Sequence, residues 1–268
     1  MKKDTPRISI VVSTYNWPEA LELCLKSIAN QIVVPDEVVI ADDGSNSSTA
    51  ELIAGLSKSY PCPLIHVWHE DIGFRLTVIR NKAIVRATGD YILQIDGDII
   101  LDKHFVEDHL RFSEQNCFAT GSRIMLQPSL SDSLLKNHCI SIGLFSKGIK
   151  NKQNAIRSFI LASYFRFRYK KDSPFYIKGC NMAFWKKDLL RVNGYNEDMT
   201  GWGYEDNEIA ARLISSGVRK QYLKFSGIVY HLYHKTNSHE RETINSAIFK
   251  EAVANKLTRC NNGMDKYI

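Results

Sequence analysis

Short apolar runs alternate with longer amphipathic segments along the first 125 residues of the chain. Short apolar runs predict buried strands, and apolar residues spaced three or four apart predict helices. Strands are predicted at residues 8–12, 38–41, 64–68, 91–96 and 118–125. Helices are predicted up to residue 29, from residue 48 onward, and at residues 76–87 and 103–115. This alternation predicts an α/β fold with a doubly wound, mostly parallel sheet and helices on both faces.

Polar residues and glycines mark the expected helix ends. Asn16, with Pro18 in the first turn, is the expected N-cap of the first helix. Residues 48–51 have the spacing of a capping box for the second helix. Gly89 is the expected stop of the helix at 76–87.

The alternation is lost between residues 126 and 175 and returns beyond them. Strands are predicted at residues 180–185 and 228–230, and helices at 186–191, 205–215 (stopped by Gly217) and 240–257. No internal repeat or low-complexity linker divides the chain. We therefore predict one domain over residues 1–268.

The composition is typical of a soluble globular protein, with 44% hydrophobic and 24% charged residues. No apolar run approaches the roughly 20 residues that span a bilayer. The N-terminal segment lacks the cleavage site of a secretory signal. The six cysteines show no paired spacing, which favours a reduced, cytoplasmic setting. The net charge of +6 favours anionic ligands or surfaces and does not indicate nucleic acid binding.

Residues 147–178 hold nine Lys or Arg and one acidic residue, interleaved with aromatic residues. An amphipathic helix near 157–168 with a basic rim would lie on an anionic membrane surface or line a ligand groove. Alternatively, a solvated helix packs on the core through its aromatic stripe. The sequence leaves these interpretations open.

Polar clusters follow several predicted strands. They comprise residues 13–16, 42–45 and 96–98, and residues 201–206 lead into a later helix. Because ligands bind beyond the carboxyl ends of parallel strands, we expect these clusters to converge. Two aspartates around a glycine, at 96–98, suit a hard divalent cation and the phosphates that it carries. Each cluster alone also fits a turn or a helix terminus.

These segments resemble glycosyltransferase family 2, whose members have the GT-A fold. In the first half the resemblance rests on residues 13–16, 39–45, 80–81 and 96–98. The second half resembles the β-1,4-galactosyltransferase group and bacterial chondroitin polymerase domains, through residues 179–184, 194–197, 201–208 and His231. The resemblance covers nearly the whole chain outside 126–175, and Gly-Trp-Gly-x-Glu-Asp with an upstream Asp-x-Asp is a specific combination.

The resemblance implies a nucleotide-sugar site. Thr14, Tyr15 and Asp43 would hold a uracil and Asp96 the ribose, while Arg80 would reach the diphosphate. The full set of expected contacts is Thr14, Tyr15, Asn16, Asp43, Arg75, Arg80, Asp96, Gly97, Asn181 and Trp202.

The resemblance also implies a metal site, in which Asp98 and His231 bind Mn²⁺ or Mg²⁺. Such ions take oxygen ligands, and manganese also tolerates an imidazole. His234 is an alternative to His231, and either histidine also fits a surface polar residue. The metal would be a Lewis acid and template for the departing UDP.

For the catalytic residues, the resemblance implies that Asp206 is the general base, which takes the proton of an acceptor hydroxyl. Glu205 would hydrogen-bond donor or acceptor, and the ring of Trp202 would stack on a pyranose. A single displacement converts an α-linked UDP-sugar into a β-glycoside. Tyr204 replaces the glycine usual in the galactosyltransferase version, which leaves the donor sugar open.

The expected activity is therefore metal-dependent, inverting transfer of a hexose or N-acetylhexosamine from a UDP-sugar to a saccharide or lipid-linked saccharide. It would serve bacterial surface polysaccharide or lipopolysaccharide synthesis in the cytoplasm, with peripheral contact to the inner face of the plasma membrane left open. Residues 1–125 would bind the nucleotide, 126–178 would be a variable acceptor or membrane-side segment, and 179–268 would hold acceptor and catalytic groups.

Three other classes are weighed against this expectation. A nucleotidyltransferase would want a phosphate loop rich in glycine and lysine near the N-terminus, and residues 13–16 are not one. A dinucleotide oxidoreductase is disfavoured because no Gly-x-Gly-x-x-Gly follows the first strand. A non-catalytic protein that binds carbohydrate or nucleotide sugar with the same fold remains an alternative, against which the intact Glu205-Asp206 pair argues.

Overall fold

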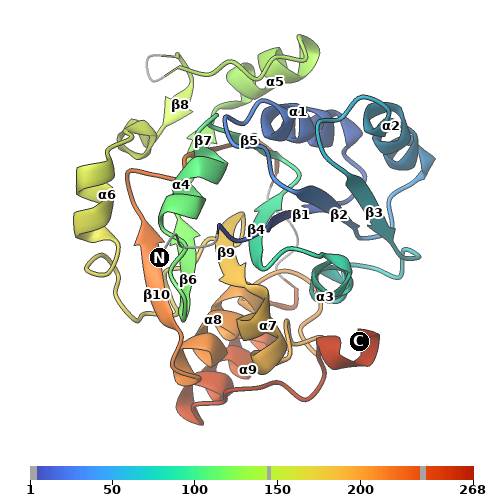
Figure 1. The fold of residues 1–268 in the computed structure, drawn as a ribbon. Coiled ribbons are helices and arrows are strands. Elements are labelled where there is room, and N and C mark those ends of the chain that lie inside the picture. Colours follow the sequence, from blue (N-terminus) through green and yellow to red (C-terminus); the bar gives the residue numbers. More distant parts are fainter. Residues whose placement is uncertain (1–4, 144–145, 236–239) are drawn as a thin grey trace.

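A seven-stranded sheet forms the centre of the molecule, as the computed structural model shows (Figure 1). The structure describes residues 5–143, 146–235 and 240–268. The strand order is β10 (Arg219–Leu223), β6 (Cys117–Gly121), β9 (Asn181–Trp185), β4 (Tyr91–Asp96), β1 (Ile8–Thr14), β2 (Glu37–Asp42) and β3 (Leu64–Trp68). Only β9 runs antiparallel to its neighbours in this sheet. The predicted α/β architecture with a mostly parallel sheet is confirmed.

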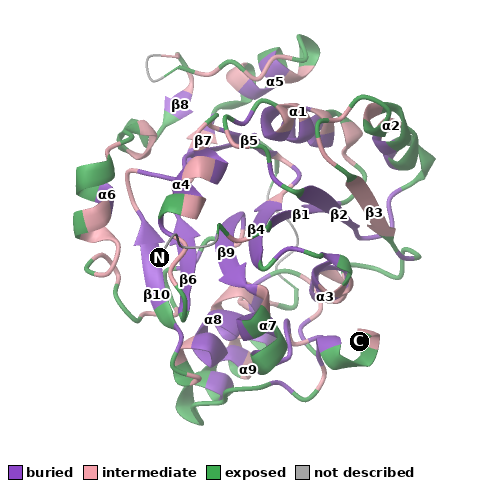
Figure 2. Cartoon of the chain, in the orientation of Figure 1, coloured by how far each residue is buried: buried purple, intermediate pink, exposed green. Residues whose placement is uncertain are grey.

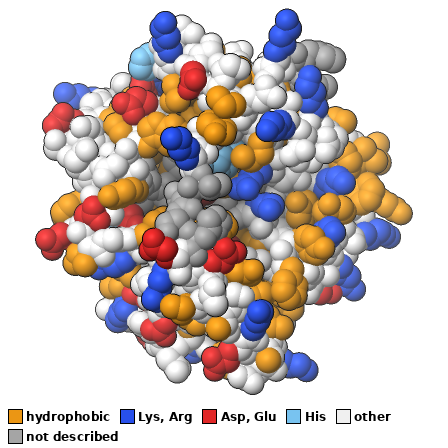
Figure 3. Space-filling view, turned by 180° about the vertical axis from the view of Figure 1, so that it is seen from behind, with side chains coloured by type: hydrophobic (Ala, Val, Ile, Leu, Met, Phe, Trp, Pro, Cys, Tyr) orange, Lys and Arg blue, Asp and Glu red, His pale blue; other side chains and the backbone are white. Residues whose placement is uncertain are grey.

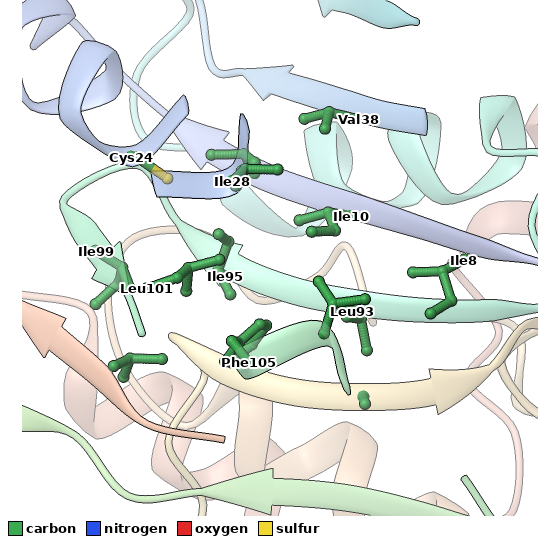
Figure 4. Close-up of a cluster of buried hydrophobic side chains, with 14 of the residues drawn as sticks. Ile8, Ile10, Cys24, Ile28, Val38, Leu93, Ile95, Ile99, Leu101 and Phe105 are labelled. Atoms are coloured by element: carbon green, nitrogen blue, oxygen red, sulfur yellow. The ribbon is translucent and has the colours of Figure 1, made fainter. Parts of the chain in front are cut away.

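Helices cover both faces of this sheet, which explains why its strands read as continuous apolar runs. Every residue of β1 and of β2 is buried (Figure 2). Alternate residues point to opposite faces of a strand. Ile10 therefore packs in one core cluster, beneath α1 (Pro18–Ala29) and α4 (Phe105–Arg111), with part of it shown in Figure 4. Val11 packs in the other cluster, against α3 (Leu76–Arg86), α7 (Lys186–Val192) and α8 (Glu205–Ser215).

A second, four-stranded sheet has the order β5 (Ile99–Leu101), β11 (Val229–His231), β7 (Ile124–Leu126) and β8 (Ile149–Lys150). The predicted single strand at 118–125 is wrong, because the chain leaves the large sheet after Gly121 and enters the small one at Ile124. The chain changes sheets in the same way between β4 and β5. This second change leaves residues 97 and 98 at the junction of the two sheets.

The remaining elements lie around this framework. They are α2 (Ser47–Ser57), α5 (Pro128–Lys136), η1 (Lys152–Ala155), α6 (Phe159–Phe165), α9 (Glu242–Ala254) and η2 (Met264–Tyr267). The irregular middle segment thus contains short elements, among them a helix that is much shorter than the amphipathic one predicted at 157–168. Within the described residues, no helix combines the length and the apolar character needed to cross a bilayer.

Three predicted helix signals are wrong. Asn16 has a left-handed φ of 45° and lies one residue before the N-cap position, which Trp17 occupies. The side chain of Asn46, rather than a capping box at 48–51, caps α2 by accepting from the Ser48 N–H. Helix α3 ends at Arg86 with Ala87, and not a glycine, as its C-cap; a side chain at Gly89 would instead collide with Ser9. The predicted stop of α8 at Gly217 is confirmed, because this glycine has a φ of 87°.

Candidate active site

A cavity of about 910 Å³ lies at the carboxyl edge of β1, β2 and β4, where the two sheets meet. All four polar clusters contribute residues to its wall. These residues are Ser13, Thr14, Tyr15, Asp43, Asp96, Gly97, Asp98, Trp202, Glu205 and Asp206. The structure therefore brings together segments that lie up to about 190 residues apart in the chain, because parallel strands all end at one edge of the sheet. In Figure 3 the opposite face from that of Figure 1 shows Lys and Arg side chains and a histidine near its centre.

Arg80 of α3 is a buried cation that connects several residues of the cavity wall, and its side chain is 1% exposed. Its Nη1 lies 3.0 Å from Oδ1 of Asp206, and its Nη2 lies 2.9 Å from Oδ1 of Asp96. Its Nε donates to Oγ of Ser13, and its guanidinium lies over the ring of Tyr195. Burial by itself would lower the pKa of Arg80, but the two carboxylates raise it above the usual value. The expectation that Arg80 reaches a diphosphate is not supported, because its charge is already neutralised by protein groups.

Asp206 stands in the first turn of α8, and its side chain is 16% exposed. Its Oδ1 accepts from Arg80, from the hydroxyl of Tyr195 at 3.0 Å and from Nε2 of Gln94 at 3.4 Å. Among the described residues, Oδ2 accepts no hydrogen bond. One oxygen thus fixes the carboxylate in place, and the other keeps its lone pairs for a ligand.

Gly179 makes room for Asp206. A Cβ at position 179 would lie 1.8 Å from Oδ2 of Asp206, which is far inside van der Waals contact. Only glycine therefore allows the carboxylate to occupy this place in the wall. The segment before β9 and the first turn of α8 therefore pack closely against each other at this point.

Glu205 is nearly buried beside Asp206. Its Oε2 accepts from the backbone N–H of Gly203 at 2.9 Å. Burial, and then the charge of Asp206, raise the pKa of Glu205 to about 7. A fraction of this carboxyl is therefore protonated near neutral pH and can donate a hydrogen bond.

Asp98, His231 and His234 form a group whose ligand atoms all lie within 4.8 Å of one another. Nε2 of His234 lies 3.1 Å and Nε2 of His231 lies 3.6 Å from Oδ2 of Asp98. The register of β11 on β5 carries His231 to Ile99, next to Asp98. Both histidines are therefore placed to bind the same ion as Asp98.

The hydrogen bonds around this group suit a divalent cation. Nδ1 of each histidine lies within 2.8 Å of a backbone carbonyl, at Leu232 and at Lys235. In a neutral imidazole this places the proton on Nδ1 and directs the Nε2 lone pair toward Asp98. Oδ1 of Asp98 is buried with no hydrogen-bond partner among the described residues. Lone pairs directed at a carboxylate repel it unless a proton or a metal lies between them. The donors present thus fit a manganese or magnesium ion.

The residues expected to bind the uracil lie at the ends of β1 and β2, away from the metal group. Asp43 accepts from Nε2 of His69 at 2.7 Å and from the backbone N–H of Arg75 at 2.9 Å. Tyr15 is 50% exposed, and its hydroxyl donates to Asp71. Gly97 packs so closely on Thr14 that a Cβ would meet Oγ1 at 3.2 Å.

Three expected contacts do not line the cavity, and the structure gives them other roles. The Asn181 side chain is fully buried, and its amide donates to the carbonyls of Ser122 and Gly227. Asn16 accepts from the Asn46 N–H and holds the turn before α1. Arg75 donates its backbone N–H to Asp43, while its guanidinium binds the Glu70 carbonyl. We therefore correct all three from ligand contacts to supporting residues.

A model of the glycosyl transferase family 2 matches residues 9–189, which is more than half of the chain. The chain belongs to glycosyltransferase family 2. A second model, described as the N-terminal domain of galactosyltransferase, matches residues 157–235. Both halves of the predicted resemblance are confirmed.

Curated relatives in the family include polysaccharide synthases. A chondroitin synthase of Escherichia coli is 28% identical over 229 residues, which cover 78% of this chain and 32% of that protein. A validoxylamine A glucosyltransferase of Streptomyces hygroscopicus subsp. limoneus is 26% identical over 230 residues, covering 80% of this chain and 49% of that protein. The chain thus spans a third to a half of the length of these relatives.

Solved structures show the same fold. The mannosyltransferase PcManGT of Pyrobaculum calidifontis, in complex with GDP-Man and Mn²⁺, matches with a TM-score of 0.62 and 20% identity, over 93% of this chain and 64% of that one. S. aureus TarS 1-349 in complex with UDP matches with a TM-score of 0.62 and 16% identity, over 97% of this chain and 68% of that one. The predicted GT-A fold is confirmed.

Several residues in or behind the cavity wall of this family 2 chain were not anticipated. Tyr195 and Gln94, which orient Asp206, lie outside the predicted site, although Tyr195 belongs to the quoted stretch 194–197. Arg123 and Lys178, in contrast, line the cavity itself. No sequence signal separates these two cations from the other basic residues around them.

Proposed function

We propose that this family 2 member is a metal-dependent, inverting glycosyltransferase. It would move a hexose or N-acetylhexosamine from a UDP-sugar to a sugar hydroxyl. The observation that carries the proposal is the geometry of Asp206, whose Oδ1 is held by three donors while Oδ2 remains unbonded within the described residues of the cavity. A carboxylate held in this way can accept a proton from a bound hydroxyl.

The nucleotide would bind at the end of the cavity formed by β1 and β2. Thr14, Tyr15 and Asp43 would contact the uracil, and Asp96 the ribose. Gly97 packs closely on Thr14 and has no side chain, so a ligand can approach the backbone at this position. Asp43 keeps its orientation through His69 and the Arg75 N–H.

Asp98, His231 and His234 would hold the metal. Two imidazoles beside one carboxylate favour Mn²⁺ over Mg²⁺, which prefers oxygen ligands. A bound ion would supply Lewis-acid stabilisation of the negative charge on the departing diphosphate. Arg80 would contribute indirectly, by fixing Asp96 and Asp206 on either side of its guanidinium.

In the transfer step, the acceptor hydroxyl oxygen would attack the anomeric carbon while Oδ2 of Asp206 takes its proton. The bond from that carbon to the diphosphate oxygen breaks, UDP leaves, and the anomeric configuration inverts. Glu205 would hydrogen-bond a sugar hydroxyl, and Trp202, which is 39% exposed, would stack on a pyranose ring. The acceptor would belong to surface polysaccharide or lipopolysaccharide synthesis, and the chondroitin synthase among the relatives supports the polysaccharide.

Turnover of nucleotide sugars tests this function. Purified protein with Mn²⁺ is incubated with UDP-galactose, UDP-glucose and the UDP-N-acetylhexosamines, with GDP-mannose for comparison, and release of the nucleoside diphosphate is measured. We expect release from at least one UDP-sugar, abolished by EDTA and restored by Mn²⁺. Binding of UDP-sugar without any turnover would favour the non-catalytic alternative, and no binding at millimolar concentration would refute the proposal.

We also propose that α6 makes the peripheral membrane contact. This short helix exposes Phe159, Ile160 and Tyr164 by 53%, 80% and 56%. The exposed cations Arg168 and Lys171 follow it, with the half-buried Lys170 between them. Apolar side chains beside basic ones suit an anionic bilayer surface. An Ile160→Ser variant should sediment less with phosphatidylglycerol vesicles, whereas Ile32→Ser, at an exposed isoleucine after α1, should not. The proposed membrane contact would be contradicted if both variants and the wild type sedimented equally, or if none sedimented.

A further inference from the structure

Two cations in the cavity wall have no task in the scheme above. Arg123 lies between β6 and β7, and Lys178 lies just before β9. Within the described residues, Nζ of Lys178 has neither a hydrogen bond nor an ion pair. From the same described residues, the guanidinium of Arg123 receives only a weak contact, with Sγ of Cys180 at 4.0 Å. Arg80, by contrast, is neutralised by two carboxylates.

The two charges are close enough to affect each other. Burial, and then the charge of Arg123, lower the pKa of Lys178. The neighbouring thiol cannot offset them, because burial and the nearby Asp96 raise the pKa of Cys180 to about 12. Two like charges on a partly dehydrated wall repel each other unless an anion lies between them. This arrangement is therefore built for an anionic partner.

The strand order of the large sheet shows on which side of the cavity the two cations lie. β1 and β2, with Thr14 and Asp43 at their ends, lie on one side of β4. β9 and β6, next to Lys178 and Arg123, lie on the other side (Figure 1). Asp96 ends β4 and Asp98 follows it, so both lie between the two sides. The cations thus lie across the reaction centre from the expected nucleotide.

We infer that Arg123 and Lys178 form a subsite for an anionic group of the acceptor, either a carboxylate or a phosphate ester. This inference rests on the proposed function, because only that function makes this side of the cavity the acceptor side. Arginine pairs with both groups through two parallel N–H donors, and lysine adds a point charge. The acceptor would then be an acidic saccharide, and a neutral sugar of the same shape would leave two cations uncompensated.

Binding of simple glycosides tests the subsite without knowledge of the natural acceptor. Protein loaded with UDP and Mn²⁺ is titrated with methyl β-D-glucoside, methyl β-D-glucuronide and methyl β-D-glucoside 6-phosphate, followed by NMR. We expect an acidic glycoside to bind at least about ten-fold more tightly than the neutral one. The tighter of the two acidic glycosides then identifies the anion as a carboxylate or a phosphate.

Substitutions locate the effect. Arg123→Gln and Lys178→Gln should each reduce the preference for the acidic glycoside to below about three-fold, with UDP affinity unchanged. Lys250→Gln, at an exposed lysine of α9 that does not line the cavity, is the matched control and should keep the full preference. Melting temperatures of all variants check that the fold is retained.

Two results would overturn the subsite. One is a wild-type protein that binds no acidic glycoside more tightly than the neutral one. The other is a loss of UDP affinity in the two cavity variants with the glycoside preference intact, which would place the donor diphosphate there. Hydrolysis of UDP-sugar without acceptor is measured separately. Its absence in the wild type would count against the proposed function, whereas a preserved glycoside preference would still support the anion subsite.

Discussion

Nη1 of Arg80 lies 3.0 Å from Oδ1 of Asp206, and this contact joins α3 to the first turn of α8. The same guanidinium reaches Asp96 at the end of β4. One buried cation therefore connects the nucleotide side of the cavity to the proposed general base. The contact also explains why Asp206 has one engaged oxygen and one that accepts no bond from the described residues.

Asp206→Asn should abolish transfer while leaving nucleotide binding intact. The amide oxygen can still accept from Arg80 and Tyr195, but the side chain cannot take a proton from an acceptor. Loss of a general base typically costs a factor of about 10² to 10⁴ in rate. The measurement is kcat with the preferred UDP-sugar, together with UDP affinity by calorimetry, which should stay within about three-fold. A variant with wild-type kcat would require another base.

Asp98→Asn should weaken the binding of Mn²⁺ and, in its presence, of UDP. Asp98 contributes the carboxylate to a group whose other two members are imidazoles. Removing either His231 or His234 should weaken Mn²⁺ affinity by at least about 10-fold, because even the loss of a residue that only orients a metal ligand typically costs about 10- to 100-fold. Calorimetric titration with MnCl₂ measures each variant. Unchanged affinity in Asp98→Asn contradicts the metal site, and an effect in only one histidine variant identifies the ligand.

The strand ends of the candidate site were predictable because each apolar run is followed directly by its polar cluster. That local pattern placed Thr14, Asp43, Asp96 and Asp98 correctly along the cavity. It failed for Asn181, whose motif resembles a ligand-binding segment. The backbone carbonyls that use its amide come from residues 122 and 227, which only the fold brings near it.

Long-range pairing accounts for the other differences. The role of Arg80 depends on carboxylates 16 and 126 positions away, so no local pattern reveals that its charge is already neutralised. The apolar stretch 118–125 looks like one strand, yet it is divided because Arg219–Leu223 pairs with its first part and Val229–His231 with its second. The strand at 219–223 was not predicted at all, and the one predicted at 228–230 gave no sign of which stretch it would pair with.

Stability should depend on pH through Glu205, whose pKa burial and Asp206 raise to about 7. The folded protein then binds the proton more tightly than the unfolded chain, in which the pKa is near 4.5. The resulting contribution to stability is full below about pH 4.5 and is lost as the pH rises through about 7. Glu205→Gln should remove this part of the pH dependence, as measured by urea unfolding at pH 5 and pH 8 in EDTA.

Glu251→Gln, at an exposed glutamate of α9, is the control for that measurement. It should leave the difference between the two pH values as in the wild type. If Glu205→Gln and Glu251→Gln behave alike, the carboxyl of Glu205 does not have the raised pKa.

Gly179→Ala should abolish sugar transfer without changing the nucleotide-binding end of the cavity. The added Cβ would lie 1.8 Å from Oδ2 of Asp206, so the carboxylate or the segment before β9 must move. Because Arg80, Tyr195 and Gln94 hold the other oxygen, the side chain cannot turn aside without losing hydrogen bonds. We expect kcat to fall by at least about 100-fold, comparable to loss of the base itself, while UDP affinity changes little.

Gly55→Ala supplies the matched control for this substitution. A Cβ at position 55, in α2, meets nothing within 4 Å, and alanine is the better helix former there. This variant should keep wild-type kcat and melt at the same or a slightly higher temperature. A Gly179→Ala enzyme with normal kcat, beside an unaffected Gly55→Ala enzyme, would show that transfer does not need Asp206 in its observed position. Another residue of the cavity would then have to be the general base.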